Sequence, residues 1–559
     1  MNAQPESGEH PVARGLRLMS RTLAAVTLLT LSACATHPGT VTWITRAPEA
    51  RPVVMTQSGP VLGAEAKGAR AFLGIPYAAP PVGDLRWRAP HPVAPWLETR
   101  EATRIGVDCT QALGRKAILG GGGGFVRGSE DCLYLNVYAP AGEASTPRPV
   151  MVYLHGGAFT IGSGANYDPT LLAVEQDRVV VTVNYRLGAL GWLAHPAFAD
   201  ESDPSGVGGN FGLMDQQVAL RWVRDNIAAF GGDPGDVTLF AESSGAWSAC
   251  YLMASPGSAG LWSRVILQSG PCLEPNSLVS APVAAAAGPA FAASVECDQG
   301  DVVACLRRLP ASTIARAAST RSGINGPGSW GPVFGDALVP VSPPEAFASG
   351  TFVQTPVIIG SNAAEGRLFA TEVRSLDRFQ KETVWMYGLT DGPRVLARYP
   401  VGADGPAIAI AQGFTDSRFA CPSNAMRRLL ARHVPVHGYE FADADAPIVL
   451  PSWITGLKMG AYHASELTYV FGRRWAFADP ARFTPEQAAL SARMRSLWAG
   501  FGHDGNFDAR WPKAGSDGGG GPVLMFKPEG DTLDAEFVAR HQCELWDGSL
   551  HGAVEPPAG

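Results

Sequence analysis

The chain has 559 residues, of which 46% are hydrophobic and 17% are charged, and its formal net charge is −7. An apolar fraction of this size is typical of globular proteins and excludes a chain that is mainly disordered. A nucleic-acid-binding protein needs a positive face, and the negative net charge, without any run of five basic residues, argues against that class.

The first predicted element is a signal peptide. Three arginines between residues 14 and 21 precede an apolar stretch over residues 23–31. About 20 apolar residues are needed to span a bilayer, so this stretch is the hydrophobic region of a signal peptide rather than a membrane helix. It ends in Leu31-Ser32-Ala33-Cys34, which resembles the lipobox of bacterial lipoproteins.

We therefore expect residues 1–33 to be the signal peptide, Cys34 to be lipidated, and residues 34–50 to form a flexible tether. The protein would then be exported, as a periplasmic or cell-surface lipoprotein that contacts a membrane only through its N-terminal lipid anchor. The alternative is an ordinary signal peptide that is followed by a cysteine. Met19 opens a conventional short signal sequence, so the sequence leaves open whether translation starts there or at Met1.

Beyond the tether, short apolar runs alternate with helical patterns. Such runs are typical of strands that are buried on both faces of a largely parallel sheet. The runs cover residues 150–154, 179–185, 237–240, 265–267 and 357–359, and a helical pattern covers residues 216–226. The sequence therefore predicts an α/β fold with a large, mostly parallel central sheet flanked by helices.

The strand at 237–240 runs into Ala241-Glu242-Ser243-Ser244-Gly245, after which a helix is expected to begin near Ser244. A strand, a turn with the pattern small-x-Ser-x-Gly and a helix are the parts of a nucleophile elbow. This tight turn lifts the serine hydroxyl above the edge of the sheet. Small neighbours are required because strand and helix pass close together there. Ser243 is the predicted nucleophile.

The strand at 150–154 leads directly into His155-Gly156-Gly157-Ala158-Phe159. Two consecutive glycines let backbone N–H groups point into an active site without side-chain interference, as an oxyanion hole requires. The alternative is a plain glycine turn after a strand. The elbow farther along the chain favours the oxyanion hole, with N–H groups from Gly156, Gly157 and Ser244.

These motifs occur with a second signature, Glu130-Asp131-Cys132-Leu133-Tyr134-Leu135-Asn136-Val137-Tyr138-Ala139-Pro140. Further matches are Gly74-Ile75-Pro76-Tyr77-Ala78, Arg86-Trp87, Asn184-Tyr185-Arg186-Leu187-Gly188 and Gln268-Ser269-Gly270. The chain thus resembles the type-B carboxylesterases, the cholinesterase-like branch of the α/β-hydrolases. The resemblance implies a catalytic domain over residues 51–547, with loops and helical insertions above the active site. We expect residues 548–559 to be a disordered tail.

The resemblance also implies the order serine, glutamate, histidine for a catalytic triad. The motif of the acid matches Gly360-Ser361-Asn362-Ala363-Ala364-Glu365-Gly366, and that of the base matches Gly460-Ala461-Tyr462-His463. Glu365 and His463 are therefore expected to complete the triad of Ser243. This assignment agrees with the chemistry, because a serine hydroxyl needs a base to take its proton and the base needs a carboxylate to orient it.

Four residues depart from the family pattern or carry open interpretations. Ala241 stands where the family has glycine, and Trp247 brings a large ring to the start of a helix where small residues are usual. Either residue could tighten the elbow or reshape the pocket. Trp330 and Phe334 lie in a stretch that lines the acyl pocket of relatives, but both could equally be core residues.

The chain has nine cysteines, and eight remain when Cys34 is set aside. An even number in an exported chain favours disulfides. The absence of a Cys-x-x-Cys pair and of clustered cysteine and histidine argues against a metal site. The resemblance pairs Cys109 with Cys132, Cys297 with Cys305, and Cys421 with Cys543. It leaves Cys250 and Cys272 unassigned, as a fourth bridge or two buried free thiols.

The resemblance implies a serine esterase that hydrolyses a small-molecule carboxylic ester through an acyl-enzyme, with no cofactor and no metal. An acyltransferase or an amidase with the same triad is the first alternative, since the acyl acceptor depends on pocket shape and water access. A non-catalytic binding protein on the same fold is the second alternative, although here all three triad residues are present. The natural ester and the oligomeric state do not follow from the sequence.

Overall fold

The computed structural model describes residues 51–551, except for residues 67, 115–123, 143, 199–208, 274–277, 320–329, 450–454, 476, 503–509 and 516–519. The predicted signal peptide, Cys34 and the tether lie outside the described residues. At the other end, helix α17 (Glu544–His551) extends the fold to residue 551, beyond the point where the tail was expected to begin. Acidic residues Glu544 and Asp547 in its first turn favour the N-terminus of a helix.

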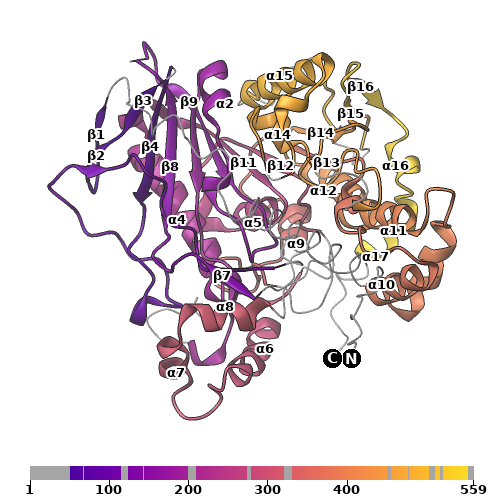
Figure 1. The fold of residues 1–559 in the computed structure, drawn as a ribbon, viewed down its shortest axis with the longest axis horizontal. Coiled ribbons are helices and arrows are strands. Elements are labelled where there is room, and N and C mark those ends of the chain that lie inside the picture. Colours follow the sequence, from indigo (N-terminus) through magenta and orange to yellow (C-terminus); the bar gives the residue numbers. More distant parts are fainter. Residues whose placement is uncertain are drawn as a thin grey trace, which may run out of the picture.

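The described residues build a central sheet of eleven strands, which runs through the middle of the molecule (Figure 1). The spatial order is β16-β15-β14-β13-β12-β11-β9-β10-β8-β4-β3. The strands are β3 (Ala64–Ala66), β4 (Ala69–Pro76), β8 (Tyr134–Pro140), β9 (Arg148–Leu154), β10 (Val179–Val183), β11 (Gly232–Glu242), β12 (Arg264–Gln268), β13 (Val357–Asn362), β14 (Val436–Phe441), β15 (Val523–Phe526) and β16 (Thr532–Asp534).

The middle of the sheet is parallel, from β10 through β9, β11, β12, β13 and β14 to β15. Antiparallel pairs occur at its edges, where β8 joins β10 and β16 joins β15. Every residue of β10 is buried, as is every residue of β12 and β13, because helices cover both faces. The predicted fold class is therefore confirmed, together with the strands expected from the apolar runs.

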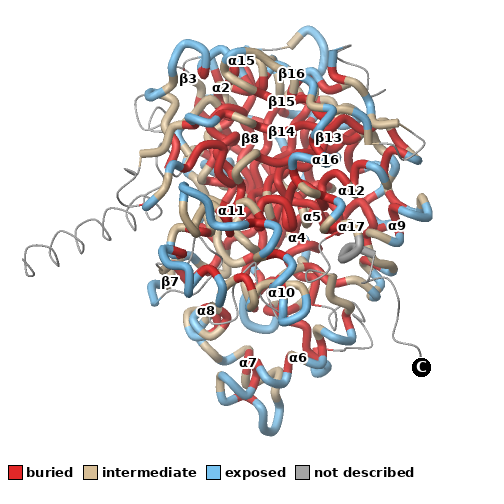
Figure 2. The backbone as a smooth tube through the Cα atoms, turned by 90° about the vertical axis from the view of Figure 1, so that its right-hand side faces the viewer, coloured by how far each residue is buried: buried red, intermediate tan, exposed pale blue. Residues whose placement is uncertain are grey.

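One face of the sheet carries α4 (Phe211–Asn226), α5 (Ser244–Met253) and α12 (Cys421–Leu430), whose apolar side chains belong to the larger core cluster. The second cluster contains α2 (Thr170–Gln176), α14 (Leu467–Phe471) and α15 (Pro485–Gly500). Figure 2 shows the result: the buried residues form a continuous centre, and exposed residues collect on the periphery.

The remaining elements lie around this core. The other helices are α3 (Gly188–Trp192), α6 (Ala281–Ser294), α7 (Val302–Arg308), α8 (Ala311–Ser319), α9 (Pro343–Ser349), α10 (Leu376–Arg398), α11 (Pro406–Thr415) and α16 (Phe537–Arg540). The other strands are β1 (Val53–Thr56), β2 (Gly59–Leu62), β5 (Arg100–Glu101), β6 (Gln111–Leu113) and β7 (Phe125–Arg127). Helices α6, α7 and α8 lie together below the sheet in Figure 1.

The structure contains the three disulfides expected from the family resemblance: Cys109–Cys132, Cys297–Cys305 and Cys421–Cys543. Cys250 and Cys272 are free and buried, so the structure contains the two thiols rather than a fourth bridge. Both sulfur atoms lie near the sulfur of Met426, at 3.7 and 4.0 Å. Among the described helices, none is long and apolar enough to cross a membrane.

Candidate active site

Ser243 lies in a sharp turn between β11 and α5, where its φ of 55° and ψ of −126° are outside the regions that most residues adopt. Close packing makes the glycines around it necessary. A Cβ atom on Gly245 would lie 2.2 Å from the carbonyl oxygen of Leu154, and one on Gly270 would lie 2.3 Å from that of Ser243. Strain of this kind is concentrated at functional sites, and it fits the predicted nucleophile elbow.

Ala241, the first departure from the family pattern, lies just before the elbow on β11. Its side chain is fully buried in the larger core cluster, beside Leu154 of β9 and Leu267 of β12 in the sheet register. The methyl group therefore packs into the core.

The structure brings the three predicted triad residues together from distant parts of the chain. His463 Nε2 lies 2.9 Å from Ser243 Oγ, and His463 Nδ1 lies 2.7 Å from Glu365 Oε2. Glu365 begins the short 3₁₀ helix η9 (Glu365–Leu368) just after β13, and His463 lies in the connection between β14 and α14. Serine, imidazole and carboxylate are thus aligned for proton transfer from the hydroxyl to the ring.

The carboxylate of Glu365 is fixed from both sides. It is fully buried, and its Oε1 accepts a hydrogen bond of 2.7 Å from the backbone N–H of Asn362. The next residue, Gly366, donates its N–H to Thr415 Oγ1 at 3.0 Å. The side chain of Asn362 donates to Glu466 at 2.6 Å, so a second buried carboxylate lies just behind the first.

His463 is buried among three glutamates, and their charges dominate its titration. Burial by itself would lower the pKa of the ring, but the carboxylates of Glu242, Glu365 and Glu466 outweigh it and raise the pKa to about 9. Glu242 Oε1 lies 3.3 Å from His463 Nε2, on the side of the nucleophile. Burial in turn raises the pKa of Glu242 well above its ordinary value and that of Glu466 to about 7.

The expected oxyanion-hole residues surround Ser243. A Cβ atom on Gly156 would lie 2.8 Å from Ser243 Cβ, and Gly157 has a φ of 120° that favours glycine. Ser244 opens α5, where a backbone N–H has no partner within the helix. Within the described chain, none of these three N–H groups donates to another residue. The following residue, Ala158, has a φ of 52° and reaches the wall of the active-site pocket, which sequence reasoning did not indicate.

A pocket of about 520 Å³, including its open mouth, lies over the nucleophile. Its lining residues are Ala158, Phe159, Ser243, Ser244, Trp247, Ser269, Trp330, Phe414, Arg418, Phe419 and His463. The wall is thus mainly aromatic and apolar, with one arginine.

The pocket resolves the open interpretations of three aromatic residues. Trp247 lines the pocket and is only partly buried, so this departure from the family pattern places a large ring in the pocket wall. Trp330 also lines it, with its indole N–H donated to the carbonyl of Ala318 at 2.9 Å. Phe334 is not a lining residue; it packs against the core and pairs its backbone with Val279 and Ala281.

Sequence reasoning missed the wall formed by Phe414, Arg418 and Phe419. Arg418 and Phe419 belong to a short π-helix, η10 (Asp416–Ala420), between α11 and α12. The ring of Phe419 lies 4.9 Å from that of His463, measured between centroids. One feature of the sequence could have indicated this wall: Phe419 lies two residues before Cys421, a cysteine that the resemblance had already placed in a disulfide. Among the described residues, no group of three or more potential metal ligands is suited to a metal ion.

Comparison with known proteins gives consistent results. A family model described as the carboxylesterase family matches residues 50–389 and 404–546. Fumonisin B1 esterase of Sphingopyxis macrogoltabida is 36% identical over 483 residues, which covers 82% of this chain and 84% of that protein. Para-nitrobenzyl esterase of Bacillus subtilis (strain 168) is 34% identical over 465 residues, which covers 81% of this chain and 90% of that protein. A solved structure of a thermophilic PNB esterase has a TM-score of 0.74 at 30% identity, covering 88% of this chain and 100% of the other.

Proposed function

The chain belongs to the carboxylesterase family and is a carboxylesterase, and we propose how it hydrolyses its ester. Ser243 is the nucleophile, His463 the base and Glu365 the acid of a catalytic triad, and the reaction passes through an acyl-enzyme intermediate. The observation that carries this mechanism is the continuous hydrogen-bonded series from Ser243 Oγ through the His463 ring to Glu365 Oε2. It meets the geometric requirement for an activated serine.

In the first half of the reaction, His463 Nε2 takes the proton of Ser243 while Oγ attacks the carbonyl carbon of the ester. The negative charge on the carbonyl oxygen is stabilised by backbone N–H groups of Gly156, Gly157 and Ser244, and Ala158 adds a further candidate donor. His463 then gives its proton to the departing alkoxide. The alcohol leaves, and the acyl group stays on Ser243.

In the second half, water replaces the alcohol. His463 Nε2 takes a proton from the water, whose oxygen attacks the acyl carbon, and the proton returns to Ser243 Oγ as the carboxylic acid is released. Glu365 holds the ring in the orientation that leaves Nε2 as the acceptor and stabilises the imidazolium ion that forms twice in each cycle. No step requires a metal ion or a cofactor.

The substrate is a small-molecule ester, and the pocket favours one with an apolar group. Burying such a group against Trp247, Trp330 and Phe419 contributes about 25 cal/mol for each Å² removed from water. The relatives are named after different esters, among them fumonisin B1 and para-nitrobenzyl esters, so their names do not select one for this chain.

We also propose that the enzyme is exported and anchored to a membrane through Cys34. The lipobox-like Leu31-Ser32-Ala33-Cys34 supports the anchor, and the three disulfides of the catalytic domain support an oxidising compartment.

Replacement of the nucleophile tests the mechanism. We expect Ser243→Ala to lower kcat on a short-chain nitrophenyl ester on the order of 10⁴-fold or more, with residual turnover from the oxyanion hole and binding. Ser248→Ala is the matched control: it lies on the same helix and loses a buried hydroxyl, which accepts a 3.0 Å hydrogen bond from Gln216. It should retain kcat. Near-normal hydrolysis by Ser243→Ala would contradict the mechanism.

A further inference from the structure

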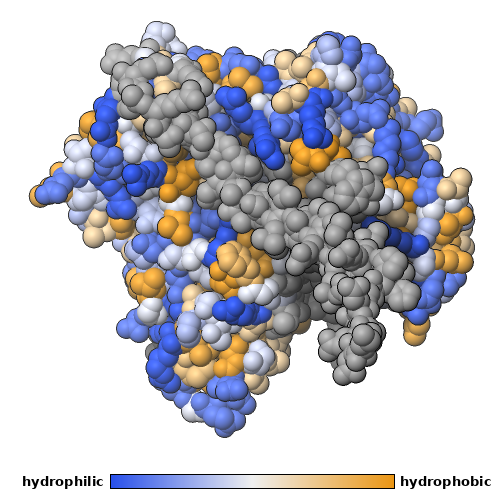
Figure 3. All heavy atoms as spheres, viewed as in Figure 1, coloured by the Kyte–Doolittle hydropathy of each residue, from blue (hydrophilic) through white to orange (hydrophobic). Residues whose placement is uncertain are grey.

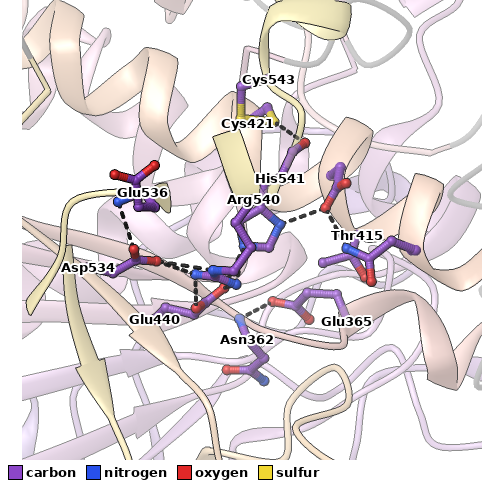
Figure 4. Close-up of polar contacts among 12 residues, drawn as sticks. Asn362, Glu365, Thr415, Cys421, Glu440, Asp534, Glu536, Arg540, His541 and Cys543 are labelled. Carbon is purple, nitrogen blue, oxygen red and sulfur yellow. Dashed lines mark hydrogen bonds and ion pairs between the residues drawn. A yellow bond between two sulfur atoms is a disulfide. The ribbon is translucent and has the colours of Figure 1, made fainter. Parts of the chain in front are cut away.

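Another buried histidine, His541, lies between the carboxylates of Asp416 and Glu440, and Figure 4 shows it together with Glu440 and the triad acid Glu365. We propose that His541 is a positioning residue for the active site: by joining Glu440 of β14 to Asp416 of η10, it holds in place the two segments that flank Glu365. The proposal rests on the proposed catalytic role of Glu365.

The contacts of His541 are short and completely enclosed. Its Nδ1 lies 2.6 Å from Asp416 Oδ1 and its Nε2 lies 2.6 Å from Glu440 Oε1. All three residues have an exposed fraction of 0%. A neutral imidazole has one N–H donor, whereas two carboxylates at both ring nitrogens need two, so the geometry selects the protonated ring.

The groups around His541 share this charge balance: Arg540 Nη1 lies 3.1 Å from His541 Nε2, and Gln412 of α11 donates to Asp416 Oδ1 at 3.1 Å. Arg540 of α16 pairs with Glu440 and with Asp534 of β16, each at 2.5 Å (Figure 4). Tyr399, immediately after α10, donates its hydroxyl to the other oxygen of Asp416 at 2.8 Å. Burial by itself would lower the pKa of His541, but the hydrogen bonds and charges of the two carboxylates raise it to about 9.

On one side, Glu440 connects His541 to the anchor of the triad acid. In the register of β13 and β14, Glu440 lies opposite Ser361, and its neighbour Phe441 lies opposite Asn362. Asn362 is the residue whose backbone N–H holds Glu365 Oε1. A shift of β14 would therefore move the donor that fixes the carboxylate.

On the other side, Asp416 connects His541 to the pocket wall. The preceding residue, Thr415, accepts the N–H of Gly366, immediately after Glu365. The π-helix that begins at Asp416 places Phe419 against the ring of His463. A displacement of Asp416 would thus reach both the acid and the base of the triad.

The charge of His541 is what makes it necessary. Removal of one partner from a buried ionic group leaves the others without compensation, which is more costly than the absence of the whole group. With a neutral side chain at position 541, Asp416 would keep only the uncharged donors Tyr399 and Gln412, and the charge of Glu440 would be balanced by Arg540 alone. We expect Asp416 and Glu440 to separate and to carry η10 and β14 with them.

The test compares His541→Gln with wild type and with Arg264→Gln. Arg264 is also buried and ion-paired, to Asp236, but it opens β12 at the amino end of the strand, opposite the catalytic end. The measurements are kcat and KM for a nitrophenyl ester, the rate of phosphonylation of Ser243 by an organophosphonate, and the pH dependence of kcat/KM.

We expect His541→Gln to lower kcat and the phosphonylation rate about ten- to a hundredfold, with KM within about threefold of wild type. The acid limb of kcat/KM should move to lower pH, because a displaced Glu365 no longer raises the pKa of His463. Arg264→Gln should lose thermal stability but keep the kcat, the phosphonylation rate and the acid limb of wild type. A general loss of stability would not move the acid limb.

The proposal is overturned if folded His541→Gln has the kcat, phosphonylation rate and acid limb of wild type, or if Arg264→Gln loses activity in the same way. If His541→Gln does not fold, Glu440→Gln takes its place, since it neutralises the opposite side of the same contact and should produce the same losses. Wild-type kcat in Glu440→Gln would overturn the proposal. A wild-type enzyme that neither hydrolyses esters nor reacts with the phosphonate would instead contradict the proposed function.

Discussion

His463 faces three carboxylates that differ in what they contact. Glu365 accepts from Nδ1 and orients the ring, whereas Glu242 lies 3.3 Å from Nε2, the nitrogen that must take the serine proton. Glu466 is hydrogen-bonded to Asn362 and Gln268, and it acts on the ring through charge alone. Carboxylates around a histidine raise its pKa, and only the neutral ring can take the serine proton. The charges of the three glutamates therefore determine the pH range in which the enzyme is active.

We expect Glu242→Gln to move the acid limb of kcat/KM to lower pH. Activity requires the neutral ring, whose pKa is raised to about 9, with Glu242 as the largest of the charges that raise it. Removal of that negative charge lowers the pKa, so the neutral form persists to more acid pH. The check is kcat/KM between pH 5 and 10 for wild type and variant. A limb that stays in place, or moves to higher pH, would contradict this electrostatic assignment.

The elements of the active site meet where parallel strands end. Ser243 follows β11, Glu365 follows β13, and His463 lies in the connection after β14, all at the carboxyl edge of the sheet. The disulfide Cys421–Cys543 lies close to this edge: it joins the start of α12 to the residue before α17, and Cys421 Sγ lies 3.3 Å from the carbonyl oxygen of His541.

We expect loss of Cys421–Cys543 to destabilise the protein more than loss of Cys297–Cys305. The two bridges have sequence separations of 122 and 8 residues. The chain-entropy model assigns about 5 kcal/mol to the long loop and about 2.5 kcal/mol to the short one. Denaturant unfolding of the two paired cysteine-to-alanine variants measures the difference. Equal losses would show that loop entropy does not govern these bridges.

Local patterns in the sequence indicate the strands and the elbow, because each depends on a few neighbouring residues, whereas Glu365 and His463 are assigned by the resemblance to the family. The apolar run at 179–183 is typical of a strand buried in a parallel sheet, and Ala241 and Gly245 around Ser243 indicate the turn of the nucleophile. The pocket wall from η10 and the contact of His541 with Asp416 and Glu440 have no such signal. The contacts of His541 join segments that are 125 and 101 residues apart, and only the fold brings these segments and the pocket wall to the site.

At the scale of the whole molecule, the catalytic domain is a single layered unit with a mixed surface. On the face seen in Figure 3, hydrophilic and hydrophobic residues are interspersed over the described part of the surface. The proposed attachment to a membrane rests on Cys34 and the apolar segment before it.

Fractionation of cells tests the anchor. We expect wild type to sediment with membranes and to be released by detergent, because more than one acyl chain, at about 0.8 kcal/mol per buried CH₂, holds a protein firmly. Cys34→Ser should be soluble or remain an uncleaved precursor. Wild type that is wholly soluble, with an N-terminus at Ala35 or later, would contradict the lipid anchor and leave an ordinary exported esterase.

The most direct test of the central claim is to locate the adduct of an organophosphonate by mass spectrometry of the digested enzyme. We expect one phosphonyl group per chain, on Ser243, with loss of esterase activity in proportion to labelling, and no labelling of Ser243→Ala. Labelling of another residue with the same loss of activity, or full activity in an enzyme labelled at Ser243, would contradict it.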